Sequence, residues 1–85
     1  MLNIKILGSG CANCKRLEAV VQKVVAQKGM EAEIEKVTDY AEIMKYPILS
    51  TPGLVIDGKL MQAGRIPSET DIARWLEQAS AQQSA

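Results

Sequence analysis

Histidine is absent from the 85 residues of this chain. Its absence excludes a Cys–His nucleophilic pair, a mixed Cys/His zinc site and acid–base catalysis by imidazole. Long apolar runs are missing as well, since none approaches the roughly eighteen residues that indicate a membrane-spanning helix. We therefore expect no membrane-embedded segment, and any chemistry must depend on other side chains.

An excess of charge of either sign is also lacking. Ten Lys and Arg residues balance ten Asp and Glu residues, so the formal net charge is zero. A neutral chain offers no electrostatic argument for a nucleic-acid or membrane partner. The segment Met1–Leu7 is too short and too interrupted by polar residues to be a secretory signal. These observations favour a cytoplasmic protein, which we expect to act as a monomer.

Cysteine is scarce, but the two cysteines present, Cys11 and Cys14, lie three positions apart. A small secreted domain usually needs several structural disulfides, and this chain could form only one. A bridge across so short a loop removes little entropy from the unfolded chain, so it would stabilise the fold poorly. The spacing therefore indicates redox or metal chemistry rather than a structural disulfide.

The apolar pattern predicts seven secondary-structure elements in the order β-α-β-α-β-β-α. A strand over 1–7, expected to be buried on both faces, precedes a helix that starts at about Cys11 or Asn13 and ends at about Lys28, before Gly29. Charges interleaved with Ala and Val over 31–37 predict an edge strand. Asp39 has the character of an N-cap for a short helix that Pro47 would stop.

The second half of the chain contains the clearest turn signal, Asp57-Gly58, between strands at 54–56 and 59–63. Ser68 is placed to cap a last helix. We predict one α/β domain over 1–79, with a four-stranded mixed sheet flanked by helices on both faces, and a flexible polar tail over 80–85.

The cysteine pair falls where the first strand ends and the first helix begins. A helix N-terminus offers unpaired N–H groups and partial positive charge, and both favour a thiolate, the nucleophilic form of cysteine. Lys15 and Arg16 add positive charge nearby. Cys11, nearer the loop, is the expected nucleophile, and Cys14, one turn into the helix, is the expected resolving thiol.

Three segments of the chain resemble the thioredoxin/glutaredoxin superfamily, and in particular its branch of small redox-active-disulfide proteins. These segments are Ile4–Cys14, Thr51–Lys59 and Gly64–Arg65. The similarity spans essentially Met1 to Gln78. It implies a thioredoxin-like fold and a thiol–disulfide oxidoreductase without a cofactor, which acts on a protein or small-molecule disulfide and is reduced by a reductase or a low-molecular-weight thiol.

The resemblance also implies roles for residues around the cysteines. Pro52 should follow a cis peptide bond beside the pair, and the backbone of Thr51 should pair with an extended substrate segment. Ala12 and Asn13 would shape the substrate site. Gly10 and Lys15 would support the pair.

Two departures from thioredoxins proper are visible in the sequence. Gly10 stands where they have a tryptophan before the first cysteine. The first strand offers only Asn3 and Lys5 as polar residues, so it lacks the buried carboxylate found beneath the cysteine pair. The group that moves the proton of Cys14 therefore stays unassigned at this point.

A second reading of the same cysteines is a binding module for a soft ion such as Cu(I), Zn(II) or As(III). Small metallochaperone domains also place Cys-x-x-Cys after the first strand. They follow the order β-α-β-β-α-β, however, whereas this chain ends on a helix after a hairpin. A third reading, a redox-sensing adaptor, stays open. No metal site beyond the two cysteines is expected.

Overall fold

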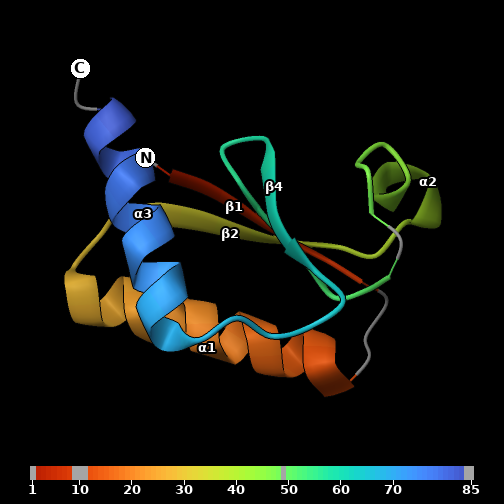
Figure 1. Ribbon diagram of the computed structural model, residues 1–85, viewed down its shortest axis with the longest axis horizontal. Helices are drawn as coiled ribbons and strands as arrows, with labels where there is room; N and C mark the ends of the chain where they lie inside the picture. Colours follow the sequence, from red (N-terminus) through yellow and green to blue (C-terminus); the bar gives the residue numbers. More distant parts are fainter. Residues whose placement is uncertain (1, 9–11, 49, 84–85) are drawn as a thin grey trace.

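A four-stranded mixed sheet forms the centre of the computed structural model, which describes residues 2–8, 12–48 and 50–83. The strands are β1 (Leu2–Leu7), β2 (Ala32–Val37), β3 (Gly53–Ile56) and β4 (Lys59–Ala63), in the spatial order β2-β1-β3-β4 (Figure 1). β1 pairs in parallel with β2 and antiparallel with β3, which pairs antiparallel with β4. The predicted α/β class, element order and mixed sheet are confirmed.

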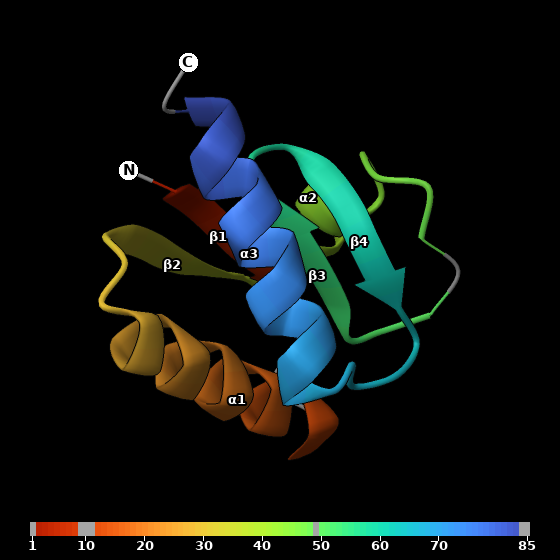
Figure 2. The ribbon, with the colours of Figure 1, turned by 60° about the vertical axis from the view of Figure 1, so that its left-hand side comes forward.

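Two long helices cover one face of the sheet. They are α1 (Ala12–Lys28) and α3 (Glu69–Gln83); in Figure 2 α3 crosses in front of the sheet and α1 lies below it. The alternation of β1 directs Leu2, Ile4 and Ile6 toward them. The main apolar core forms there, with further buried residues from α1, β3 and α3, namely Leu17, Val21, Val24, Leu54, Ile56, Ile72, Leu76 and Ala79.

The opposite face of the sheet has a thinner cover. Its main element is the short helix α2 (Tyr40–Ile43), which lies behind the sheet in Figure 2. A second cluster of four buried residues forms beneath it: Leu7, Ile43, Ile48 and Val55. Asn3 and Lys5 also point to this face and are half-buried. β1 is therefore fully buried on one face only, whereas its sequence suggested burial on both.

The predicted capping and turn residues act at the expected places. The N–H of Ala41 donates to Asp39 Oδ1 at 3.0 Å, and the N–H of Asp71 donates to Ser68 Oγ at 3.1 Å. Each bond satisfies an N–H in the first turn of a helix. Asp57 and Gly58 both have positive φ, 50° and 83°, as a two-residue hairpin turn of this kind requires.

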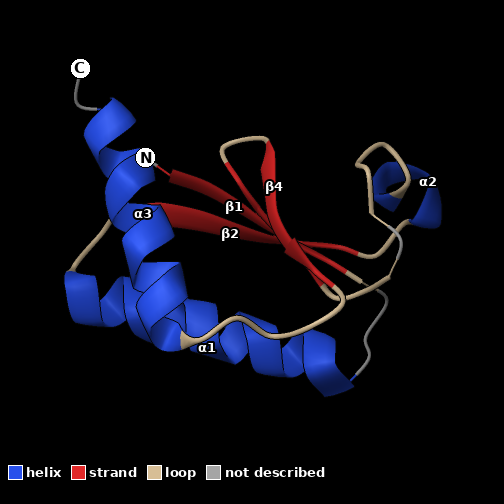
Figure 3. Ribbon diagram, in the orientation of Figure 1, coloured by secondary structure: helices blue, strands red, loops and turns tan. Residues whose placement is uncertain are grey.

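Two boundaries differ from the sequence-based expectation (Figure 3). α2 ends at Ile43 rather than Tyr46, and the chain continues in turns toward Pro47. α3 continues to Gln83, so residues 80–83 are helical although the flexible tail was predicted to start at 80. Ser, Ala and Gln are compatible with a helix once the preceding turns pack against the sheet, and packing is what a local sequence reading lacks.

Candidate active site

Four chain segments converge at the end of the sheet where β1 stops. Leu7 pairs with Val37 of β2 and with Gly53 of β3, and Gly53 pairs with Ala63 of β4. The residues that follow or precede these positions therefore meet at the same edge. This edge brings the start of α1, the Thr51–Pro52 loop and Gly64 into one region.

Cys14 lies in the first turn of α1 and is 5% exposed. It is disulfide-bonded in this structure. Cys11, the only other cysteine of the sequence, and Gly10 lie outside the described residues, and so does the geometry of the predicted pair. Ala12, Asn13 and Lys15 are all exposed around the first turn of α1. Their predicted roles in the substrate site and in supporting the pair remain predictions.

Gly8 lies close to both Cys14 and the Thr51 loop. It is buried directly after β1, and its N–H donates to the carbonyl of Val37 at 3.0 Å. A Cβ on Gly8 would collide with Cys14 Sγ and would lie 3.6 Å from Thr51 Cβ. Cys14 and Thr51, 37 positions apart in the sequence, thus both border the same small space. Sequence reasoning gave Gly8 no role beyond ending the strand.

The Thr51–Pro52 peptide bond is cis, as the resemblance implied. Pro52 is buried, whereas Thr51 is exposed. The carbonyl of Pro52 accepts a bond from the N–H of Gly64 at 2.9 Å, which ties the loop to the end of β4. A Cβ on Gly64 would collide with Ser50 Oγ, so this glycine also marks a close approach.

A small cavity of about 110 Å³ adjoins Cys14. Its lining is mostly apolar and comes from β1, α1 and the end of β2: Ile6, Gly8, Cys14, Lys15, Lys36 and Thr38. Lys36 and Thr38 were not among the predicted site residues. The signal that could have found them is the parallel pairing of β1 with β2, because it sets Lys36 beside Ile6 on the face that α1 covers.

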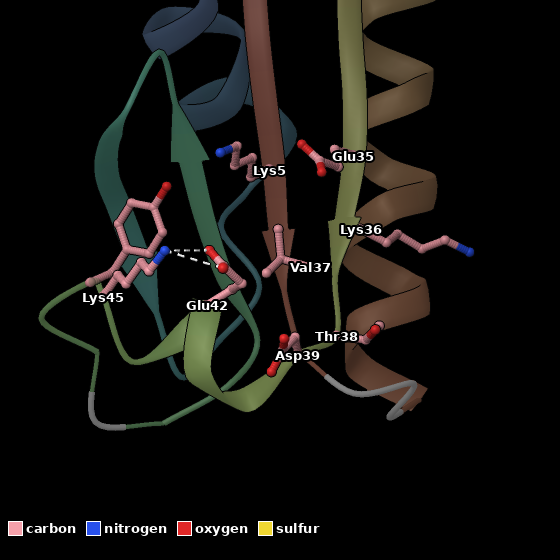
Figure 4. A pocket seen from close by; sticks show the side chains of 9 residues that line it. Lys5, Glu35, Lys36, Val37, Thr38, Asp39, Glu42 and Lys45 are labelled. Carbon is pink, nitrogen blue, oxygen red and sulfur yellow. Dashed lines mark hydrogen bonds and ion pairs between the residues drawn. The ribbon is translucent and has the colours of Figure 1, made fainter.

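A larger hollow, of about 430 Å³, lies elsewhere, against the α2 face of the sheet. Figure 4 shows its mixed charges, with Lys5 and Glu35 on the strands and the ion pair of Lys45 and Glu42 at its side, where Nζ lies 3.0 Å from Oε2. Cys14 does not line it. For that reason we do not place the active site there.

Exposed apolar side chains gather near Thr51. Among the described residues, the exposed large hydrophobic ones are Tyr40 and Met44, and both line a shallow depression of about 80 Å³ together with Ser50 and Thr51. Tyr46 instead packs against the smaller apolar cluster. Of the two tyrosines, Tyr40 is therefore the one that borders the Thr51 loop.

The described residues show neither a cluster of three metal-ligating side chains nor a membrane-spanning helix. Within ranges 2–8, 12–48 and 50–83, no three His, Cys, Asp or Glu side chains come together. No helix in that same part of the chain is long and apolar enough to cross a membrane. The described part also contains no buried polar or charged side chain, so no buried carboxylate lies beneath Cys14 there.

Comparison with known proteins identifies the family. The model of a thioredoxin domain matches residues 2–77. A thioredoxin of Methanothermobacter thermautotrophicus is 38% identical over 76 residues, which cover 89% of this chain and 99% of that protein. A thioredoxin of Methanocaldococcus jannaschii is 39% identical over 77 residues, which cover 91% of this chain and 88% of that protein.

A solved structure agrees at the level of the fold. The germline-specific thioredoxin Deadhead of Drosophila melanogaster superposes with a TM-score of 0.64 at 17% identity, covering 91% of this chain and 79% of that one. The sequence matches to two thioredoxins agree with the shared fold and with the position of Cys14 in the first turn of α1. The chain therefore belongs to the thioredoxin family and is a thiol–disulfide oxidoreductase.

Proposed function

We propose that the chain exchanges a Cys11–Cys14 dithiol with the disulfide of a protein or a small molecule. The observation that supports this most is the position of Cys14. It is disulfide-bonded and buried at the N-terminus of α1, and it shares the space beside Gly8 with Thr51. A cysteine pair at a helix N-terminus beside a substrate loop is suited to thiol–disulfide exchange.

The proposed reaction proceeds in two exchange steps. The Cys11 thiolate attacks one sulfur of the substrate disulfide, so a mixed disulfide forms and the other substrate sulfur leaves as a thiolate. Cys14 then loses its proton and attacks Cys11. The Cys11–Cys14 bond forms, the mixed disulfide breaks, and the second substrate thiolate takes up a proton. The substrate gains two electrons, and the protein disulfide is later reduced by a reductase or a low-molecular-weight thiol.

The surrounding residues have proposed roles in this scheme. The backbone of Thr51 would pair with an extended substrate segment, and Pro52 would hold that loop against the cysteines. Ala12 and Asn13 would contact the substrate from the start of α1, where both are exposed. Gly10 and Lys15 would support the pair, Lys15 through its positive charge. We place this activity in the cytoplasm.

A redox titration of the metal-free protein tests the proposal. Free thiols are trapped by alkylation in dithiol buffers of known potential and counted by mass. We expect a reversible two-electron transition between about −180 and −300 mV, the range of known exchange proteins. If the thiols do not pair reversibly and are protected from alkylation only when a soft metal is added, the proposal is wrong and the metal-binding module replaces it.

Two single variants separate the roles of the cysteines. Cys11→Ser should lose disulfide reduction entirely, because it removes the attacking thiolate. Cys14→Ser should still attack but should accumulate the mixed disulfide, which mass spectrometry detects as an adduct. If Cys11→Ser reduces a substrate disulfide at the rate of the parent protein, the assignment of Cys11 as nucleophile fails.

A further inference from the structure

The second exchange step requires a thiolate at a buried sulfur. Cys14 is 5% exposed, and burial disfavours the charged form of a thiol. β1 offers no carboxylate to receive its proton, since its polar residues are Asn3 and Lys5. Both lie on the α2 face, away from Cys14. Besides the N-terminus of α1, a positively charged side chain close to Cys14 would stabilise this thiolate.

The cavity beside Cys14 contains one positive side chain from the neighbouring strand. Lys36 of β2 pairs with Ile6 of β1 in the parallel register, so its side chain leaves the sheet on the α1 side. Figure 4 shows it extending from β2 toward α1, and Lys36 lines the same cavity of about 110 Å³ as Cys14. Its ammonium group thus approaches the first turns of α1.

Glu18 holds that ammonium group near α1. It lies one turn after Cys14 on the helix, and its Oε2 is 3.8 Å from Lys36 Nζ. The side chain of Glu18 is 22% exposed, whereas the other ion-paired carboxylates in the described residues are 41% exposed or more. A separation of 3.8 Å is longer than a charge-assisted hydrogen bond, so Glu18 does not fully neutralise the positive charge of Lys36.

We propose that Lys36, oriented by Glu18, is the positioning residue that stabilises the Cys14 thiolate during the second exchange step. This inference rests on the proposed function. In that step the Cys14 proton passes to water, the thiolate forms the bond to Cys11, and the substrate thiolate leaves and is protonated. Lys36 gives up no proton. It lowers the free energy of the negative charge on Cys14 Sγ through its own positive charge.

Few charged side chains other than Lys36 lie close enough to Cys14 to stabilise its thiolate. α1 contributes Lys15, Glu18 and Arg16, of which Arg16 is exposed and does not line the cavity. β2 contributes Lys36, and the described part of β1 and of the Thr51 loop contributes no charged group on this side. Lys15 also lines the cavity and is the main competitor. Glu18 alone would disfavour a thiolate, since its charge is negative.

The test measures the ionisation of Cys14 directly. The sequence has two cysteines, so Cys14 is the only thiol left in a Cys11→Ser background. The thiolate is followed by its ultraviolet absorbance and by the rate of alkylation as the pH is raised. Lys36→Met and Lys36→Arg are compared with Lys15→Met, and with Lys23→Met as a control farther along α1, where Lys23 pairs with Glu69.

Lys36→Met should move the titration midpoint of Cys14 upward by about half a pH unit or more, and Lys36→Arg should restore it. The second exchange step at neutral pH should slow about threefold in Lys36→Met with both cysteines present, since fewer molecules have the thiolate. Thermal unfolding checks that the variants are folded. The side chain of Lys36 is 65% exposed, so methionine should be tolerated.

Two results would overturn the proposal. One is a Lys36→Met midpoint equal to that of the parent or of Lys23→Met, and the other is a shift in Lys15→Met at least as large as that in Lys36→Met. The titration does not require exchange activity. A folded protein without disulfide reduction would therefore refute the proposed function, whereas an unchanged midpoint would refute only the role of Lys36.

Discussion

The two ends of the central sheet use glycine for different physical reasons. At the end where β1 stops, Gly8 and Gly64 lie so close to Cys14 and Ser50 that a Cβ at either position would collide. At the opposite end, Gly58 sits in the hairpin turn with nothing within 4 Å of where its Cβ would be. Here glycine serves only the positive φ of the turn.

The hairpin end is held by two hydrogen bonds between its turn and the start of β1. The N–H of Asp57 donates to the carbonyl of Asn3 at 2.7 Å, and the N–H of Asn3 donates to Asp57 Oδ1 at 2.8 Å. These bonds join the turn to the start of β1. The comparison indicates that the end of the sheet beside Cys14 and the Thr51 loop needs close packing for the active site, whereas the hairpin end has a structural role. Three substitutions test this comparison.

Gly8→Ala should have the largest effect. Its new methyl group would collide with Cys14 Sγ, and the backbone φ of +153° adds to the strain. We expect a loss of about 3 kcal/mol in the free energy of unfolding, the upper part of the usual range for overpacking. Disulfide reduction should fall about 10- to 100-fold because Cys14 and Thr51 are displaced. Urea denaturation and a disulfide-reduction assay measure the two effects.

A double-mutant cycle gives the control for Gly8. In a background with both cysteines replaced by alanine, the Cys14 sulfur is absent, so the cost of Gly8→Ala should be much smaller. An equal cost in both backgrounds would show that the backbone conformation, and not the approach of the sulfur, requires glycine there.

Gly64→Ala should have the second largest effect, about 2 kcal/mol. Its φ is +85°, a left-handed conformation, and its Cβ would meet Ser50 Oγ. Since the Gly64 N–H bonds to the Pro52 carbonyl, a shift there should also reduce exchange activity. Ser50→Ala should recover part of the stability by removing the hydroxyl. If it recovers none, the contact with Ser50 is not what limits the site.

Gly58→Ala should have the smallest effect and serves as the matched partner of Gly64→Ala. The two glycines have nearly the same φ, 83° and 85°, but Gly58 has no neighbour within 4 Å. We expect a loss of about 1 kcal/mol from the backbone alone and exchange activity within about twofold of the parent. A marked loss of activity in this variant would contradict the assignment of the hairpin end to structure only.

Much of the fold could be predicted because its signals are local. The helical spacing of Leu17, Val21 and Val24 indicated α1, and Asp57-Gly58 indicated the hairpin between β3 and β4. The end of α3 was missed, because residues 80–83 have no apolar pattern of their own and continue a helix that packs earlier along the chain. A local reading has no access to that packing.

The site was predicted in part for a related reason. The placement of Cys14 at the start of α1 followed from the local sequence pattern, and the cis bond before Pro52 was implied by the family resemblance. Gly8 could not be assigned a role, because its neighbours Cys14 and Thr51 are brought together only by the closed sheet. Lys36 was missed because its partner Glu18 belongs to a different element.

By itself, the sequence determined the order of the elements, the position of Cys14 at a helix start and the turn chemistry, since each depends on residues a few positions apart. The tertiary structure alone decided which distant side chains share the space around Cys14. That outcome depends on strand register and on the packing of α1 against β1 and β2, because a one-residue slip in β2 would turn Lys36 to the opposite face.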